Sequence, residues 1–243
     1  DGQDPHYPSQ FTTGKFRVTS FALTAEDTGK DFDSDGTLDN NLPNALGVVD
    51  TLLKDDDMSP EGFNARIAEA IAAHDMNILL QTSYEDGVLT VDILAGAWDE
   101  GSQTLTVDPV SYGDDGQPTS HLLGVFSDES TFETEPASTI LPVTFLPGEP
   151  PSTVPLERTQ LWGTMTDESI DATVVGVIPG LRLADDVLID LIPEEGYGNF
   201  SKEQLENLLR TMAQQEAIAD IVLQGEERGI SSAFDMTATS VEW

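Results

Sequence analysis

Short segments of alternating apolar and polar residues, separated by turns rich in Gly, Pro and Asp, run through the middle of this sequence. The pattern predicts strands over residues 104–110, 121–126, 140–145, 157–164 and 172–178. Regularly spaced short strands of this kind favour a sandwich or a barrel over a parallel α/β sheet. We therefore expect an α+β fold that is mostly β, built as an antiparallel β-sandwich-like domain.

A first strand is predicted from residue 15. Phe16 and Val18 fall on one face of this strand, whereas Phe21 and Leu23 fall on the other. Such a change of face is typical of an extra residue in the strand, so we expect a β-bulge near Ser20.

The clearest hairpin joins strands over residues 78–84 and 88–95 through Glu85-Asp86-Gly87. An Asp-Gly pair readily adopts the positive φ angles that a tight hairpin turn requires. A last strand over residues 233–241 alternates apolar and polar residues and should close the sheet.

Helical spacing interrupts the strands twice. A helical pair is expected as an insertion within residues 43–75, where Ser59 caps the second helix. One long C-terminal helix is expected over residues 201–223, before the last strand. There Ser201 and Gln204 match a capping box and apolar residues recur about every 3.6 residues.

The domain organisation is expected to be simple. Residues 1–14 are largely polar and include two prolines, which predicts an extended N-terminal arm. Residues 15–243 are expected to form a single β-rich domain, since no repeat of fixed period and no long low-complexity tract divides them. The chain has no Cys, which excludes disulfides, but it is long enough to bury a core without them.

The charge balance limits the partners. The chain has 45 Asp and Glu against 10 Lys and Arg, a formal net charge of -35, and no Lys or Arg lies between Arg66 and Arg158. Such a surface repels phosphate backbones and anionic lipids, so we expect no nucleic-acid partner and no direct membrane insertion. No apolar run approaches the ~20 residues of a membrane span. Divalent cations or cationic partners would relieve the repulsion.

One motif carries chemistry. Asp31, Asp33, Asp35, Thr37 and Asp39 follow the D-x-D-x-D-G-x-x-D spacing of EF-hand-like calcium loops. In such loops the aspartates supply carboxylate oxygens, Thr37 supplies its backbone carbonyl, and a glycine permits the sharp turn. Oxygen-only ligands favour Ca²⁺ over transition metals. The other interpretation is a solvated turn that is rich in Asp and Gly for backbone reasons.

Two neighbours of the motif add further expectations. Leu42 occupies position 12, where an EF-hand places a bidentate Glu, so another residue or water must complete the ligand shell. Leu38 is expected to anchor the loop to the core.

Three segments, Phe21-Ala22-Leu23, Asp33 to Leu42 and Asn77-Ile78-Leu79-Leu80, together resemble a group of uncharacterised exported calcium-loop proteins of myxobacteria and related Deltaproteobacteria. The region from Gly176 to Leu209 is also similar to the later part of these proteins. The resemblance covers about half of the chain and implies export and calcium binding. The chain departs from the group by the insertion Pro43-Asn44-Ala45, and it lacks a second acidic loop at residues 224–229.

The sequence also leaves other functions open. The histidines are His6, His74 and His121, and only His121 lies where a Ser-His-Asp arrangement is conceivable. Glycoside hydrolysis needs only a carboxylate pair, which so acidic a chain provides by chance. Trp98 and Trp162 could line a sugar-binding face, although core packing is the more common fate of large aromatic residues.

The preferred prediction is a secreted or periplasmic calcium-binding structural or interaction protein, not an enzyme. It would belong to an envelope or extracellular assembly, with a protein partner or self-assembly. Residues 1–10 and 240–243 would be its contact segments. A carbohydrate-binding module is the alternative, followed by a carboxylate-based hydrolase.

Overall fold

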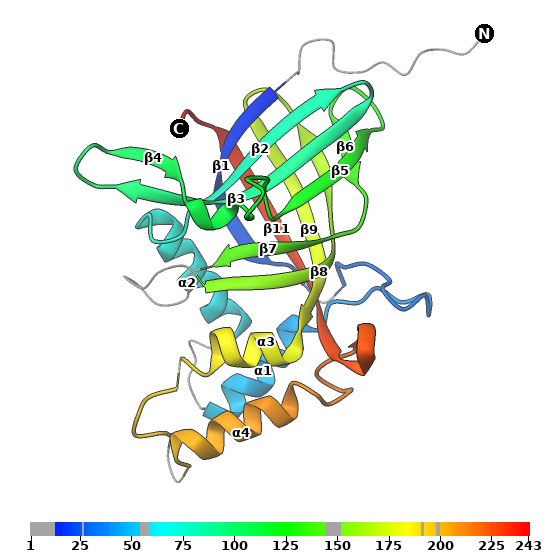
Figure 1. Ribbon diagram of the computed structural model, residues 1–243. Coiled ribbons are helices and arrows are strands. Elements are labelled where there is room, and N and C mark those ends of the chain that lie inside the picture. Colours follow the sequence, from blue (N-terminus) through cyan, green and yellow to red (C-terminus); the bar gives the residue numbers. More distant parts are fainter. Residues whose placement is uncertain (1–12, 26, 54–58, 144–151, 191, 198–199) are drawn as a thin grey trace.

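The computed structural model describes residues 13–25, 27–53, 59–143, 152–190, 192–197 and 200–243. Within them, eight antiparallel strands form a closed barrel, since the first and last strands also pair with each other (Figure 1). The barrel strands, in pairing order, are β1 (Thr13–Leu23), β2 (Ile78–Glu85), β3 (Val88–Asp99), β5 (His121–Phe126), β6 (Thr131–Thr134), β8 (Ser152–Met165), β9 (Ser169–Pro179) and β11 (Arg228–Ser240).

The predicted β-sandwich is therefore wrong. The seam between β1 and β11 runs from Phe16 opposite Ser240 to Leu23 opposite Phe234. A sandwich strand and a barrel strand have the same alternation of residues, because each has one buried face. The sequence pattern thus carries no signal for the closing contact, and closure removes the two exposed edges that an open sheet would leave.

Three short strands extend the barrel. β4 (Thr104–Val107) pairs with the end of β3 and forms a projecting hairpin, whereas β7 (Ala137–Val143) pairs with β8 and β10 (Ile221–Val222) with β11 (Figure 1). β6 was not predicted. The strand expected over residues 104–110 ends at Val107 and passes into the 3₁₀ turn η2 (Pro109–Ser111).

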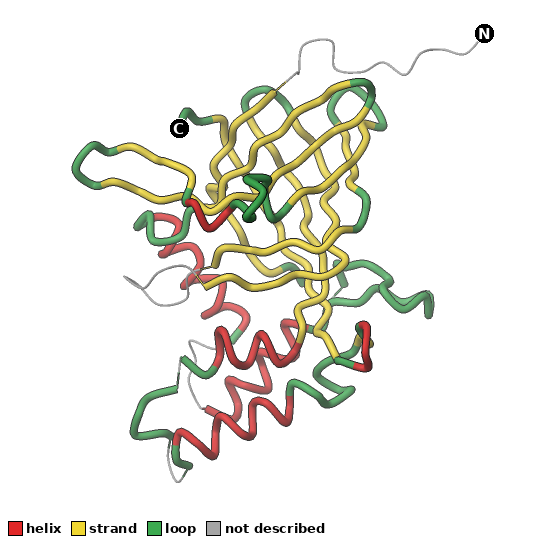
Figure 2. The backbone as a smooth tube through the Cα atoms, viewed as in Figure 1, coloured by secondary structure: helices red, strands yellow, loops and turns green. Residues whose placement is uncertain are grey.

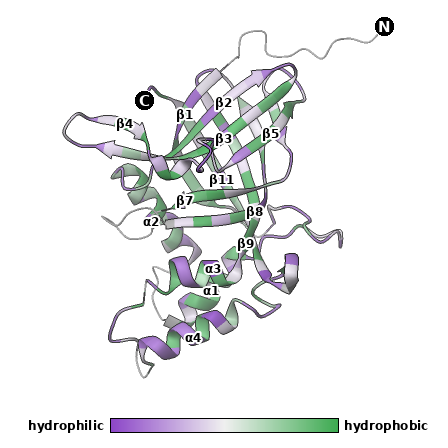
Figure 3. Ribbon diagram, in the orientation of Figure 1, coloured by the Kyte–Doolittle hydropathy of each residue, from purple (hydrophilic) through white to green (hydrophobic). Residues whose placement is uncertain are grey.

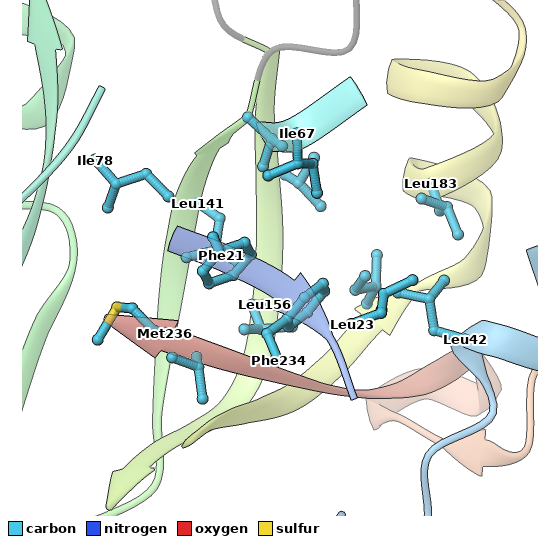
Figure 4. Packing of buried hydrophobic residues seen from close by; sticks show 14 of the residues in the cluster. Phe21, Leu23, Leu42, Ile67, Ile78, Leu141, Leu156, Leu183, Phe234 and Met236 are labelled. Atoms are coloured by element: carbon cyan, nitrogen blue, oxygen red, sulfur yellow. The ribbon is translucent and has the colours of Figure 1, made fainter. Parts of the chain in front are cut away.

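A bulge in β1 places apolar residues from both halves of this strand inside the barrel, next to its pairing with β11. The register between β1 and β11 shifts between Val18 and Ser20, which confirms the predicted bulge. The extra residue changes the facing of the strand, so that Phe16, Val18, Phe21 and Leu23 are all buried in one core. Phe21 stacks on Phe234 across the seam with ring centroids 4.6 Å apart (Figure 4).

The helices gather at one end of the barrel (Figure 2). α1 (Leu42–Leu53) and α2 (Pro60–Ala72) confirm the predicted helical pair, and the Ser59 side chain accepts a hydrogen bond from the Gly62 amide as its cap. At the other end of α2, the half-buried Arg17 guanidinium on β1 donates to the Ile71 carbonyl at 2.7 Å. Hydrophobic residues on α1 and α3 (Gly180–Leu183) join the core that fills the barrel (Figure 3).

The last helix is shorter than predicted. α4 (Lys202–Met212) begins with the expected capping box of Ser201 and Gln204, but the helix ends at Met212 and not near residue 223. Ala213 caps α4, and the chain then turns so that β10 can pair with β11. Ile218 and Ile221, which continue the apolar period, are buried through this turn. Tertiary pairing therefore overrides the helical period here.

The two ends of the domain differ from the expected contact segments. Thr13 and Gly14, predicted as part of the arm, already belong to β1 and pair with β2, whereas residues 1–12 lie outside the described residues. At the C-terminus, Trp243 packs on a small outer cluster of Leu79, Leu94 and Leu105. None of the helices in the described part of the chain has the length and apolar character that a membrane span requires.

Candidate metal centre

The acidic loop connects the end of β1 to α1 (Figure 1). A β-bridge between Lys30 and Asp39 closes its base, with the Asp39 amide 3.0 Å from the Lys30 carbonyl. Gly29 is required beneath this bridge, because a Cβ at that position would lie 2.3 Å from the Asp39 carbonyl oxygen. The loop is thus closed by backbone contacts before its carboxylates are considered.

Three of the predicted ligands lie together. Asp31, Asp33 and Asp39 each offer a carboxylate oxygen, and these oxygens all lie within 4.8 Å of one another. Asp31 and Asp39 are half-buried, whereas Asp33 is exposed. The donors are hard oxygens, and the set fits a hard divalent cation such as Ca²⁺.

Backbone amides orient two of these carboxylates. Asp31 accepts from the amides of Asp35 and Gly36 at 3.2 and 3.0 Å. Asp39 accepts from the Phe32 amide at 2.6 Å. Gly36 has a φ of 90°, a left-handed conformation that glycine adopts without a steric penalty, as the motif predicted.

Asp35 and Thr37 are placed differently. The Asp35 carboxylate accepts from the Thr37 amide at 2.7 Å, so it caps its own turn, and it is outside the cluster of three. The predicted roles of Asp35 and of the Thr37 carbonyl as ligands remain predictions.

The protonation behaviour of Asp39 reflects this crowding. Burial raises the pKa of its carboxyl above the ordinary value, although the hydrogen bond from the Phe32 amide lowers it. The negative charges of Asp33, Asp220 and Asp35 raise this pKa further. The loop therefore holds the ionised form of Asp39 at an electrostatic cost that a bound cation would offset.

The anchor of the loop is not Leu38, whose residue surface is 52% exposed, so that prediction is wrong. Asn40 anchors it instead. Its buried amide group donates to Thr24 Oγ1 at 3.0 Å and to the Ala25 carbonyl at 2.9 Å, and its carbonyl accepts from the Ala233 amide at 3.1 Å. Polar side chains thus join the loop to the barrel strand β11.

Leu42, at the twelfth position of the motif, starts α1 and is only 1% exposed (Figure 4). It is part of the core and provides no oxygen to the loop. The carboxylate that the sequence analysis missed nearby is Asp220, which accepts from the Ser231 amide at 2.9 Å and from the Ser231 hydroxyl. Asp220 and Asp39 both line an open cleft of about 490 Å³. No local sequence pattern connects Asp220 to the motif, because only the fold brings them together.

Arg158 is the second residue that the motif did not reveal. It lies in β8 where the register with β9 shifts, and its φ of 54° is left-handed. Its guanidinium donates to the carbonyl of Phe32, inside the loop, at 3.0 Å and to the carbonyl of Val222 at 3.2 Å. The one sequence signal for Arg158 is that it is the first basic residue after Arg66.

The alternative sites find other contacts. Trp98 stacks on His74 with ring centroids 4.0 Å apart, and Trp162 lies beneath the Lys30 ammonium, 5.9 Å from its ring centroid. Both tryptophans are half-buried. Each tryptophan therefore has an intramolecular partner on at least part of its ring.

His121 pairs with the buried Asp92 at 2.7 Å, so two members of a Ser-His-Asp arrangement are adjacent. The neighbouring Ser120 hydroxyl, however, donates to the Ile140 carbonyl and accepts from the Ile140 amide. These contacts hold Ser120 against the backbone of β7. They do not direct it toward His121 as a nucleophile.

None of the protein-family models, curated proteins or solved structures compared with the chain matches it. The resemblance to the myxobacterial group therefore stays a prediction.

Proposed function

We propose that this protein is an exported calcium-binding structural or interaction protein, in which loop 31–39 binds one Ca²⁺. The observation that carries the proposal is the convergence of the Asp31, Asp33 and Asp39 oxygens within 4.8 Å. Like charges held this close repel one another, and a divalent cation converts the repulsion into attraction. The Thr37 carbonyl and water would complete the shell.

The role assigned to the ion is structural. The residues that follow the cluster are hydrogen-bonded to β11. The Asn40 side-chain carbonyl accepts from the Ala233 amide, and the Asn41 backbone amide donates to the Ser231 carbonyl at 3.0 Å. An ion in the loop would therefore stiffen the connection between β1 and α1 where it meets β11. Binding to the folded loop in preference to the unfolded chain stabilises the fold by mass action.

The exported location is part of the same proposal. A ligand set without the bidentate Glu of an EF-hand suits the dissociation constants of roughly 10⁻⁴–10⁻³ M that are typical of extracellular calcium modules. Calcium outside the cell would fill such a site. The large negative charge of the chain also favours loading by divalent cations.

Thermal and urea unfolding with calcium and with chelator test the proposal. At free calcium about 100 times the dissociation constant, the wild-type protein should gain about 2.7 kcal/mol of stability. Asp33→Asn combined with Asp39→Asn should remove this gain, because two of the three clustered carboxylates lose their charge. Asp114→Asn changes an exposed aspartate in another turn and should keep the full gain. A double variant that still gains as much as wild type would refute the site.

A further inference from the structure

The outer face of the barrel carries an exposed apolar patch on neighbouring strands. Val88 on β3 is 43% exposed, and Leu123 and Val125 on β5 are 43% and 56% exposed. We call these three residues the β3–β5 patch. Their sequence neighbours Leu89 and Leu122 are fully buried, so the alternation of the strands directs the patch residues outward.

The strand register makes these residues neighbours. Leu123 lies opposite Thr90, and Gly124 lies opposite Leu89. Val88 precedes Leu89 on β3 and Val125 follows Gly124 on β5, so these two valines come directly after the last pair of this antiparallel register. Scattered single apolar residues on a surface need no explanation, whereas contiguous exposed apolar residues are a feature of interaction sites.

The residues beside the patch are acidic. Glu133 on β6 lies opposite Val125, and the Glu135 amide donates to the Leu123 carbonyl, so both exposed glutamates border β5. Strands β2, β3, β5 and β6 contain no Lys or Arg. The patch is therefore an apolar surface with two carboxylates at its border, on strands that contribute no Lys or Arg.

The chain itself shows what kind of group binds at this border. Trp162 on β8 lies opposite Glu133, and the Lys30 ammonium reaches both, at 3.7 Å from the Glu133 carboxylate and 5.9 Å from the indole centroid. An ammonium over an indole face and beside a carboxylate is a favourable cation–π and ionic contact. Lys30 thus provides one example of a basic group held at this edge of the patch.

We propose that the β3–β5 patch docks a basic amphipathic segment of a partner protein. Apolar side chains of that segment would cover Val88, Leu123 and Val125. Its Lys or Arg residues would pair with Glu135 and share the Glu133 carboxylate with Lys30. A second copy of this chain fits the patch poorly, because each copy carries a formal charge of -35. The inference rests on the interaction role proposed above, but not on the calcium loop.

A synthetic amphipathic peptide is the probe. It has about 18 residues, roughly five helical turns, with Leu on one face and Lys on the other. Fluorescence anisotropy in about 0.15 M salt gives its dissociation constant for the full chain. Leu123→Thr combined with Val125→Thr should weaken binding at least about tenfold. Thr suits a strand, and a thermal melt confirms that the variant is folded.

The controls separate the patch from general charge attraction. Val110→Thr combined with Val222→Thr alters two exposed valines elsewhere and should leave the dissociation constant unchanged. A peptide with Glu in place of Lys should not bind. Wild type that fails to bind the Lys peptide, or equal binding by both double variants, would overturn the proposal.

Two further outcomes are informative. Wild type that forms dimers in light scattering, when Leu123→Thr with Val125→Thr does not, would overturn the basic partner in favour of self-association. The titration is repeated in chelator to separate this inference from the calcium proposal. If calcium fails to stabilise the protein but patch-dependent binding persists in chelator, the calcium site is refuted and the docking surface is supported.

Discussion

In the acidic loop at residues 31–39 and in the turn at Asp128, aspartate side chains accept hydrogen bonds from backbone amides. The pKa of Asp39 in the loop is nevertheless raised, whereas the pKa of Asp128 is lowered. Asp128, between β5 and β6, accepts from the amides of Ser130 and Thr131, and these hydrogen bonds lower its pKa. Asp39 accepts from the Phe32 amide, but burial and neighbouring carboxylates raise its pKa. Hydrogen bonds from backbone amides are therefore common to both turns. The feature that distinguishes a candidate ion site from a solvated turn is the close approach of several carboxylates.

Asn40→Ala should have the largest effect. It removes the buried amide that bonds Thr24, Ala25 and Ala233, so we expect a loss of about 3 kcal/mol in the free energy of unfolding. Asn44→Ala, an exposed neighbour, should change stability by less than about 0.5 kcal/mol. Urea titration measures both. Equal losses would mean that the loop is held no more firmly than a surface turn.

Arg158→Met should have the next largest effect. It leaves the carbonyls of Phe32 and Val222 without their guanidinium donor, which should cost about 1–2 kcal/mol. Arg182→Met breaks an exposed ion pair on α3 with Asp186 and should cost less than about 0.5 kcal/mol. If the two variants unfold at the same urea concentration, Arg158 does not tie the loop to the barrel.

Asp39→Asn should be mildly stabilising in chelator. The folded state raises the pKa of Asp39, so this group favours folding below its unfolded value of 3.8, and that contribution is lost as the pH rises through the folded pKa. At neutral pH the variant should therefore be more stable by less than about 1 kcal/mol, because the site is partly screened by solvent. The difference should vanish near pH 3. A destabilised variant at neutral pH would contradict it.

Asp128→Asn should show the opposite sign and the smallest effect. The lowered pKa of Asp128 contributes stability above its unfolded value of 3.8, and the contribution is lost as the pH falls through the folded pKa. The variant should be slightly less stable than wild type at neutral pH and equal to it in strong acid. Thermal melts across the pH range measure this, with Asp114→Asn as the control.

Local chemistry made several parts of the structure predictable. The β2–β3 turn has positive φ at both Asp86 and Gly87, as an Asp-Gly hairpin requires. The bulge near Ser20, the capping box at Ser201 and the gathering of three motif aspartates also follow from residues that are close in sequence.

The parts that failed depend on contacts between distant segments. Closure of the barrel joins β1 to β11, and neither strand pattern contains a sign of its partner. The end of α4 at Met212 is set by the pairing of β10, and Asp220 reaches the loop only through that same turn. Spacing along the chain reports local geometry, whereas these features depend on which distant surfaces meet.

The antiparallel seam between β1 and β11 has a mechanical consequence. Phe16 is paired with Ser240, so the start of the first strand and the end of the last leave the barrel at the same end, away from the helices (Figure 1). A pulling force applied through these two ends would break the seam hydrogen bonds one after another, as in a zipper. It would not load them all together. The barrel should therefore yield to low force in this direction, however stable it is to heat.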